Sequence, residues 1–230
     1  MRAFFTESVY FGAAVSLLTY FLGMQLKKRF RLAVLNPLLL SILFTIAVLL
    51  AGRISYDTYY EGAKYLSYLL TPATICLAIP LYEQFEVLKK NRKAVLAGIT
   101  AGTITSMLCI FVMAVLFRFS HEEYVTFLPK SITTAIGMGV SEELGGYVPV
   151  TAAVIIITGV VGNVIAEPVL KLFRIRESVA KGIAIGTASH AIGTAKAMEI
   201  GEVEGALSSL SIVVAGILTV IGANLFAGLL

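Results

Sequence analysis

Hydroxyl side chains gather at three points of this sequence where a helix is expected to begin within an otherwise apolar stretch. Their types and spacing suit the binding of a small anion. The first amides of a helix lack intrahelical partners and together carry about half a positive charge. Amides and hydroxyls at one place can donate hydrogen bonds to a carboxylate, which predicts an oxyanion site. For each hydroxyl, the alternative is a bond to a carbonyl of its own helix one turn earlier. The hydroxyls are Thr71 and Thr74; Ser131, Thr133 and Thr134; and Thr187 and Ser189.

Titratable residues near these stretches are the candidate charges. His190 is one of two histidines, and titratable groups inside a membrane usually serve a pathway, so it could bind a carboxylate or carry a proton. Lys130 and Lys196 could supply fixed positive charge, and Glu204 could carry a proton. The alternatives are a structural histidine, lysines that extend to the lipid headgroups, and a glutamate at the membrane interface.

Asn163 and Glu167 are four residues apart and therefore share one face of a predicted helix. From there they could bond to a broken helix, either as part of the site or as support for it. The sequence contains no HExxH, GxSxG or P-loop motif and no Cys/His cluster with metal-ligand spacing. We therefore expect no enzyme activity, no cofactor and no bound metal.

Transmembrane helices are the elements expected to position these residues. The chain has 230 residues, of which 58% are hydrophobic and 14% charged, and its mean hydropathy is +0.89, which excludes a soluble domain. Six uncharged runs each reach about the 18 to 20 residues that cross a bilayer. The runs are Ser8–Leu26, Leu32–Gly52, Tyr65–Tyr82, Ala94–Phe117, Leu144–Ala166 and Gly205–Leu230.

Clusters of basic residues predict the orientation of these spans. They lie at 27–31, 89–93 and 171–176, and by the positive-inside rule all three face the cytoplasm, which puts the N-terminus outside. The net charge of +4 is then explained by basic residues that set the orientation in the membrane and contact anionic lipid, and it does not indicate nucleic-acid binding. The uncharged part of Tyr124–Glu143 is too short to cross. This segment is predicted to be a re-entrant hairpin or a pair of half-helices, or alternatively a surface helix.

Two other segments are predicted to contain broken helices. Val179–Gly205 is rich in Gly, Ala, Ser and Thr, which favours close packing and an interrupted helix. In Leu69–Tyr82, Pro72 and Pro80 interrupt the hydrogen-bond ladder, and Thr71 is placed to cap a new helix that starts at Pro72. Both segments are expected to line a small-solute pathway.

An internal alignment indicates a duplication. Leu32–Gly52 aligns with Val148–Pro168, and Ala94–Phe117 aligns with residues from Leu210 onward. We predict one transmembrane domain, 1–230, made of two halves, 1–117 and 118–230, that are inverted in the membrane. The expected fold is all-α and polytopic, with about six full transmembrane helices and two broken or re-entrant segments. The small residues of Ala97–Gly102 suit either a homo-oligomer or an internal contact.

Three motifs of this chain resemble those of the LrgB/CidB family of bacterial inner-membrane proteins. They are TPATICLAIPLYEQ, LPKSITTAIGMGVSEELGG and KGIAIGTASHAIGTAKAMEIGEVEGA. The resemblance implies a multi-pass protein of the bacterial inner membrane, and it implies two functions. One is antiholin-like control of murein hydrolase activity and autolysis with a small LrgA/CidA-type partner. The other is transport of small monocarboxylates of the pyruvate, lactate, glycolate or glycerate class, since plastid relatives move glycolate and glycerate and bacterial relatives are linked to pyruvate uptake. The interrupted helices and the histidine favour transport, because a simple pore needs neither.

Overall fold

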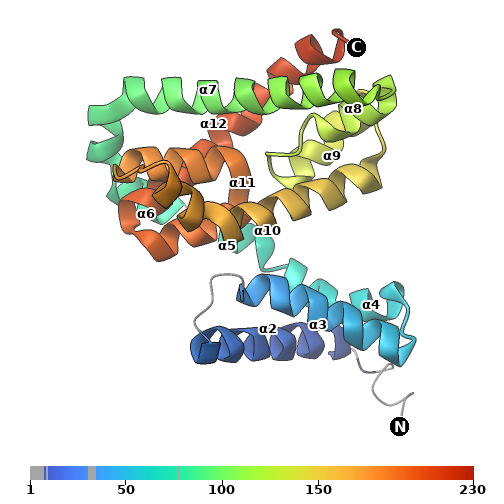
Figure 1. The fold of residues 1–230 in the computed structure, drawn as a ribbon. Coiled ribbons are helices and arrows are strands. Elements are labelled where there is room, and N and C mark those ends of the chain that lie inside the picture. The colour runs from blue at the N-terminus through green and yellow to red at the C-terminus, as the bar shows by residue number, and fades with distance from the viewer. Residues whose placement is uncertain (1–7, 9, 31–34, 77) are drawn as a thin grey trace. The chain divides into compact units, whose positions relative to one another are not determined.

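The structure is a computed structural model that describes residues 8, 10–30, 35–76 and 78–230, without the side chains of residues 70, 71, 74 and 81. Within these residues all regular secondary structure is helical, as expected (Figure 1). The helices are α2 (Phe11–Phe30), α3 (Pro37–Gly52), α4 (Tyr56–Ser67), α5 (Leu70–Cys76), α6 (Ala78–Glu83), α7 (Phe85–Phe117), α8 (His121–Phe127), α9 (Thr134–Glu143), α10 (Val148–Leu172), α11 (Ser178–Ile200) and α12 (Glu202–Ala227).

The chain forms two compact units, Met1–Cys76 and Leu77–Leu230. Unit 1 packs α2 against α3 and α4. The Thr19 hydroxyl of α2 lies 3.0 Å from the hydroxyls of both Ser41 and Thr45 in α3. Asn36 caps α3, because its side chain accepts bonds from the first free amides and Pro37 supplies the preferred backbone angle. Unit 1 is thus joined by hydroxyl bonds between helices.

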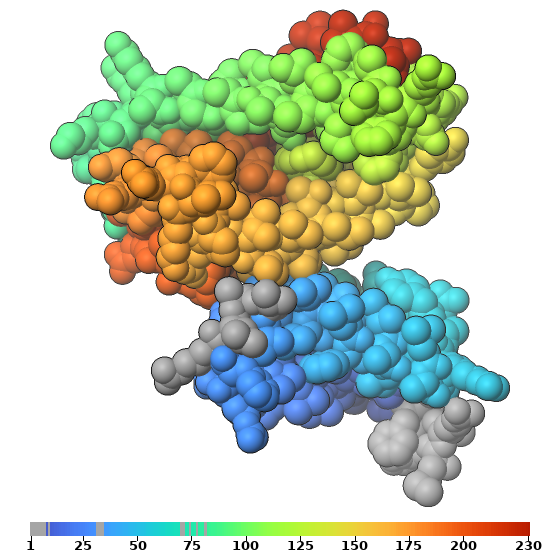
Figure 2. Space-filling model, viewed as in Figure 1, coloured from blue at the N-terminus to red at the C-terminus, as the bar shows by residue number. Residues whose placement is uncertain are grey.

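Three helices of unit 2 are long and apolar enough to cross a membrane, namely α7, α10 and α12, and α3 of unit 1 is a shorter apolar helix. Large apolar side chains remain exposed along α7 and α10, such as Leu108, Val112, Ile157 and Val161. These two helices form much of the face of unit 2 seen in Figure 2. An apolar exterior of this kind is typical of a helix that faces lipid.

The interruption predicted near Pro72 is confirmed, because α4 ends at Ser67 and α5 begins at Leu70. Pro80 lies inside α6, and the residue before that helix is outside the described part of the chain. Helix α5 begins at Leu70, so Thr71 lies in its first turn and not at an N-cap. The side chains of Thr71 and Thr74, both predicted site residues, lie outside the described part of the chain.

Residues His121–Glu143 fold as two short helices, α8 and α9, joined at 128–133; we call this segment hairpin 1. Both of its helices contact the start of α10, because Thr151 Oγ1 donates to the Thr126 carbonyl of α8 and to the Ser141 hydroxyl of α9, at 3.0 and 2.7 Å. Tyr124 in α8 donates to the Phe226 carbonyl of α12 at 3.0 Å. Two half-helices are one of the forms predicted for this segment.

Helix α11 is also a hairpin, which we call hairpin 2. Ser189 and His190 have non-helical backbone angles, and His190 has a φ of 43° and a ψ of −140°. A Cβ atom on Gly193 would lie 3.1 Å from Ile185 Cγ2, whereas these residues would be about 12 Å apart along a straight helix. Lys181 and Glu199 line one pocket, although a straight helix would separate them by about 27 Å. The predicted break is therefore a reversal, two residues after Thr187.

The two hairpins enter unit 2 from opposite ends. Hairpin 1 precedes the N-terminus of α10, and hairpin 2 follows its C-terminus, so the length of α10 separates their bases. Their tips approach each other, because Ser131 and Thr187 line the same cavity. Figure 1 shows hairpin 1 and α11 on the two sides of unit 2.

Candidate functional site

Hydroxyl groups from four elements meet between the hairpin tips, and we call the space that they enclose the hydroxyl cavity. Apolar side chains close it, among them Met107, Leu128 and Ile132. Ser106 lies about 17 Å from the C-terminal end of α7, which is roughly half of a bilayer's ~30 Å hydrocarbon thickness. The cavity hydroxyls are Thr103 and Ser106 of α7, Ser131 of hairpin 1, Thr187 of hairpin 2 and Thr219 of α12.

Lys130 brings a positive charge to this cavity. Its Nζ atom donates to Ser131 Oγ at 2.9 Å and to Ser106 Oγ at 3.3 Å, and the two hydroxyls lie 3.0 Å apart. No carboxylate of the described residues forms an ion pair with Lys130. A charged group away from water is normally paired, so this ammonium is suited to an anion that arrives from outside the protein.

Thr103 supplies a second unused donor. Its Oγ1 atom is buried and, among the described residues, is the only buried side-chain nitrogen or oxygen without a hydrogen-bond partner. Such groups are rare in native proteins and call for an explanation, such as a ligand or a water molecule. Thr103 lines the cavity and Lys130 bonds to two hydroxyls of its wall, so both bring donors to the same place.

The other predicted hydroxyls in hairpin 2 bond to their own helix. Thr187 Oγ1 donates to the Ile183 carbonyl at 2.7 Å, and Ser189 Oγ donates to the Ile185 carbonyl at 3.1 Å. Gly102 lets α7 approach Thr187, since a Cβ there would lie 3.0 Å from Thr187 Oγ1. Gly98 and Gly102 of the small-residue face therefore serve an internal contact with α11.

The hydroxyl cavity has a volume of about 10 Å³, which is the space that one water molecule needs. A two- or three-carbon acid does not fit in it. A ligand of that size could enter only if a hairpin tip moved.

His190 forms the turn of hairpin 2 and is held by α10. The side chain is 3% exposed, and its Nε2 atom lies 3.0 Å from the Ile155 carbonyl oxygen. A Cβ on Gly159 would lie 2.7 Å from the imidazole Cε1 atom, so a glycine is needed for the ring to fit. These contacts give His190 a structural task, which is to fix the tip against α10.

The turn predicts an unusual order of stability at this position. His190→Ala loses the bond to the Ile155 carbonyl, which costs about 0.5–1.5 kcal/mol. His190→Gly loses the same bond but suits the positive φ, so it should be about 1 kcal/mol more stable than the alanine variant. Thermal unfolding in detergent measures both. At the helical residue Ala188 the order should reverse, with glycine the less stable; the same order at both positions would contradict a turn at His190.

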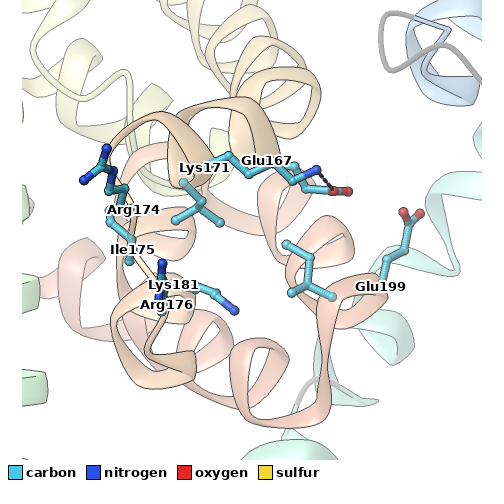
Figure 3. A pocket seen from close by; sticks show the side chains of 9 residues that line it. Glu167, Lys171, Arg174, Ile175, Arg176, Lys181 and Glu199 are labelled. Carbon is cyan, nitrogen blue, oxygen red and sulfur yellow. Dashed lines mark hydrogen bonds and ion pairs between the residues drawn. The ribbon is translucent and has the colours of Figure 1, made fainter.

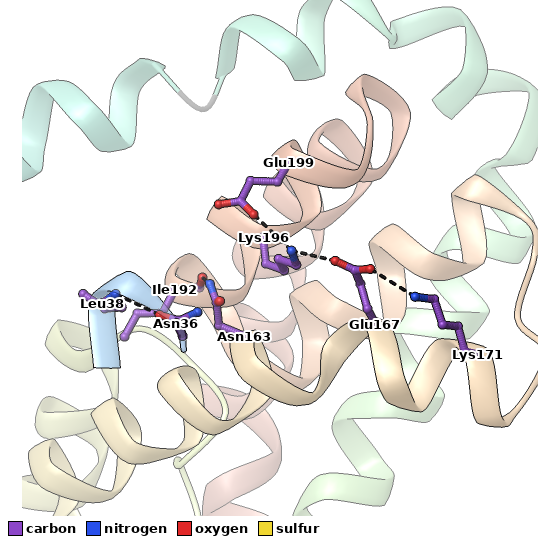
Figure 4. A network of polar contacts seen from close by, with 8 residues as sticks. All are labelled: Asn36, Leu38, Asn163, Glu167, Lys171, Ile192, Lys196 and Glu199. Carbon is purple, nitrogen blue, oxygen red and sulfur yellow. Dashed lines mark hydrogen bonds and ion pairs between the residues drawn. The ribbon is translucent and has the colours of Figure 1, made fainter. Parts of the chain in front are cut away.

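Asn163 and Glu167 both contact hairpin 2, in agreement with their spacing on α10. Asn163 Nδ2 donates to the Ile192 carbonyl at 2.7 Å, and Glu167 forms an ion pair with Lys196 at 2.7 Å. Lys196 also pairs with Glu199 at 3.0 Å. Figure 4 shows these contacts joining the end of α10 to the returning half of hairpin 2.

The remaining predicted residues lie away from the hydroxyl cavity or at its rim. Glu204 is buried at the start of α12 and pairs with Lys181 at 3.5 Å. Thr133 is the N-cap of α9 but makes no side-chain capping bond, and Thr134 is the first residue of that helix. The structure therefore brings Lys130, Ser131 and Thr187 together, while Lys196 and Glu204 belong to ion pairs.

Thr103, Ser106 and Thr219 were not predicted from the sequence as site residues. Their signal is weak, because single hydroxyls in an apolar span are common and can bond to their own helix. The three-residue spacing of Thr103 and Ser106 does put them on one face of α7. That this face of α7 borders the cavity follows only from its contact with the tip of hairpin 1 in the folded protein.

Comparison with known proteins gives a consistent result along the chain. The model of the LrgB-like family matches residues 16–229. An antiholin-like protein LrgB of Bacillus cereus (strain B4264) is 36% identical over 222 residues, which covers 96% of each chain. A protein of the same name from Bacillus anthracis (strain CDC 684 / NRRL 3495) gives the same identity and coverage. No solved structure matches.

Proposed function

Because the chain belongs to the LrgB-like family, a family of bacterial membrane proteins, we propose that it is a carrier of small monocarboxylates of the pyruvate, lactate, glycolate or glycerate class. The observation that carries this proposal is the Lys130 ammonium, which lies near the middle of the apolar part of α7, Ala94–Phe117, and bonds only to hydroxyls among the described residues. A charge in this position is costly without an anion. A monocarboxylate supplies one negative charge and is small.

In the bound state, the carboxylate accepts hydrogen bonds from Lys130 Nζ and from nearby hydroxyls. Ser131 and Ser106 already hold the ammonium, and Thr103 has a free donor. The 2-oxo or 2-hydroxy group of the solute would bond to the remaining hydroxyls. Because the present cavity holds about one water, this conformation is closed, and one hairpin withdraws to admit the solute.

Hairpins that enter from opposite ends suit alternating access. If each tip closes one side of the site, withdrawal of one tip at a time exposes the cavity to one side only. We further propose that halves 1–117 and 118–230 are inverted repeats and that about six helices cross the bacterial inner membrane. The N-terminus would lie outside. The basic residues at 89–93 and 171–176 lie at the same end of unit 2 in Figure 1, which supports a cytoplasmic side there.

Purified protein in liposomes tests the proposal. We expect saturable exchange of labelled pyruvate or glycolate that unlabelled monocarboxylate competes away, and no release of a trapped dye of either charge. Thr103→Val keeps the shape of the side chain but removes its donor, and it should weaken uptake without reducing the amount of inserted protein. Release of dyes regardless of charge, or no uptake of any of the four acids, would contradict the carrier.

The names of the relatives favour a second candidate function. They are called antiholin-like proteins. In this second function the chain would regulate murein hydrolase activity and autolysis together with an LrgA/CidA-type partner. Assembly as a homo-oligomer would belong to the same function. This candidate predicts altered autolysis without solute flux. If a variant that cannot transport still regulates autolysis normally, this second candidate is favoured over the carrier.

A further inference from the structure

A second and larger pocket lies at the far end of α10 from hairpin 1. It has a volume of about 560 Å³ and is lined by the end of α10, the turn that follows it, and both ends of hairpin 2. Four of its lining residues are basic, namely Lys171, Arg174, Arg176 and Lys181. Figure 3 shows Lys181 extending into the opening and the guanidinium group of Arg174 at its rim, directed outward. We call this space the cationic pocket.

Carboxylates pair with the two lysines of the cationic pocket but not with its two arginines. Glu167 pairs with Lys171 at 3.5 Å and with Lys196, which does not line the pocket. Lys181 pairs with Glu204 at 3.5 Å. Arg174 and Arg176 form no ion pair with any residue that the structure describes. Both guanidinium groups are therefore available to an external anion, and their planar donors suit a phosphate group.

The surroundings of the cationic pocket are amphiphilic. Leu170, Ile175 and Ile200 supply an apolar part of its wall. Leu172 and Phe173, which adjoin it at the end of an apolar 25-residue helix, are 75% and 70% exposed. Basic residues that directly follow a membrane-spanning helix lie at the level of the lipid headgroups. A soluble anion would gain nothing from this apolar rim, whereas a phospholipid can place its glycerol and acyl chains there.

We propose that the cationic pocket binds the phosphate group of an anionic phospholipid, which clamps the end of α10 to the base of hairpin 2. Basic pockets between membrane helices are suited to such headgroups. The site lies away from the hydroxyl cavity and does not depend on the function proposed for it. Since the pocket is shared by α10 and hairpin 2, bound lipid would hold the base of this hairpin while its tip is free to move.

Substitution of Arg174 by glycine removes one positive charge and should not destabilise the fold. Arg174 follows α10 with a φ of 54°, a conformation that favours glycine. Arg174→Gly should therefore fold at least as well as the native protein. Arg118 provides a matched control, because it is exposed, follows α7 with a φ of 56° and does not line the pocket.

Native mass spectrometry of the full chain, titrated with phosphatidylglycerol or phosphatidylcholine, tests the proposal. We expect preferential binding of phosphatidylglycerol, about fivefold weaker in Arg174→Gly, roughly 30-fold weaker in Arg174→Gly with Arg176→Gln, and unchanged in Arg118→Gly. Equal loss in the Arg118 control would mean diffuse attraction and overturn the proposal. Displacement of the lipid by an equal concentration of glycerol 3-phosphate would assign the pocket to a soluble phosphate and overturn it too.

Discussion

Lys130→Met is expected to lower the uptake of labelled pyruvate by liposomes about 100-fold or more. Removing one partner of a buried, hydrogen-bonded charge pair typically costs about 2–5 kcal/mol of binding, and each 1.4 kcal/mol is a factor of ten in affinity. The ammonium is the only charged group that we place on the substrate, so its loss removes the largest attraction. The initial rate of uptake at a concentration below saturation measures the effect.

The same substitution should leave the protein stable, which separates function from folding. An apolar side chain of similar length replaces a charge whose described partners are two hydroxyls, and such replacements are often neutral or stabilising. The melting temperature should therefore not fall. Lys93→Met, at an exposed position near the start of α7, should affect neither property. Full uptake by Lys130→Met would remove Lys130 from the site.

Gly186→Ala is expected to destabilise unit 2 by about 3 kcal/mol, at the upper end of the range for overpacking. A Cβ at this position would lie 2.5 Å from the Ser208 carbonyl oxygen and 2.7 Å from Ser211 Cβ. Backbone atoms of α12 cannot move aside as a side-chain end can. Helix α12 and hairpin 2 must therefore separate, which also disturbs Thr187 next to Gly186. Thermal unfolding followed by size-exclusion chromatography in detergent measures the loss.

Gly139→Ala is the matched control for this substitution. Gly139 lies within α9, and nothing is within 4 Å of the Cβ that it would gain. Alanine is favoured over glycine in a helix by up to about 1 kcal/mol, so this variant should be as stable as the native protein or more so. Similar losses in the two variants would mean that α11 and α12 are not packed as closely as described.

The sequence predicted the local breaks well because their causes are local. A proline removes a backbone donor wherever it lies in a fold, and α4 ends shortly before Pro72. The short uncharged run after Lys130 cannot cross a bilayer. The contacts of Asn163 and Glu167 with a broken helix also followed from a four-residue spacing. These predictions needed only the period of a helix and the polarity of its neighbours.

The reversal of hairpin 2 was not predictable in the same way. The Gly-rich composition of Val179–Gly205 favours a break, but the break falls at Ser189 and His190, and only packing against Gly159 and Asn163 of α10 selects that position. The partner hydroxyls on α7 and α12 were missed for a related reason. Their membership of the site depends on contacts between residues far apart in the chain, which no local pattern encodes.

The size of the hydroxyl cavity also bears on whether protons can leak across the membrane through the protein. Protons cross a membrane rapidly along a continuous file of water molecules, and an apolar constriction interrupts such a file. A space for a single water bounded by Met107, Leu128 and Ile132 provides no file. We therefore expect the closed form of the proposed carrier to conduct no protons, so that many copies could reside in an energised membrane without depolarising it. Any leak current would report the fraction of molecules whose hairpins have parted.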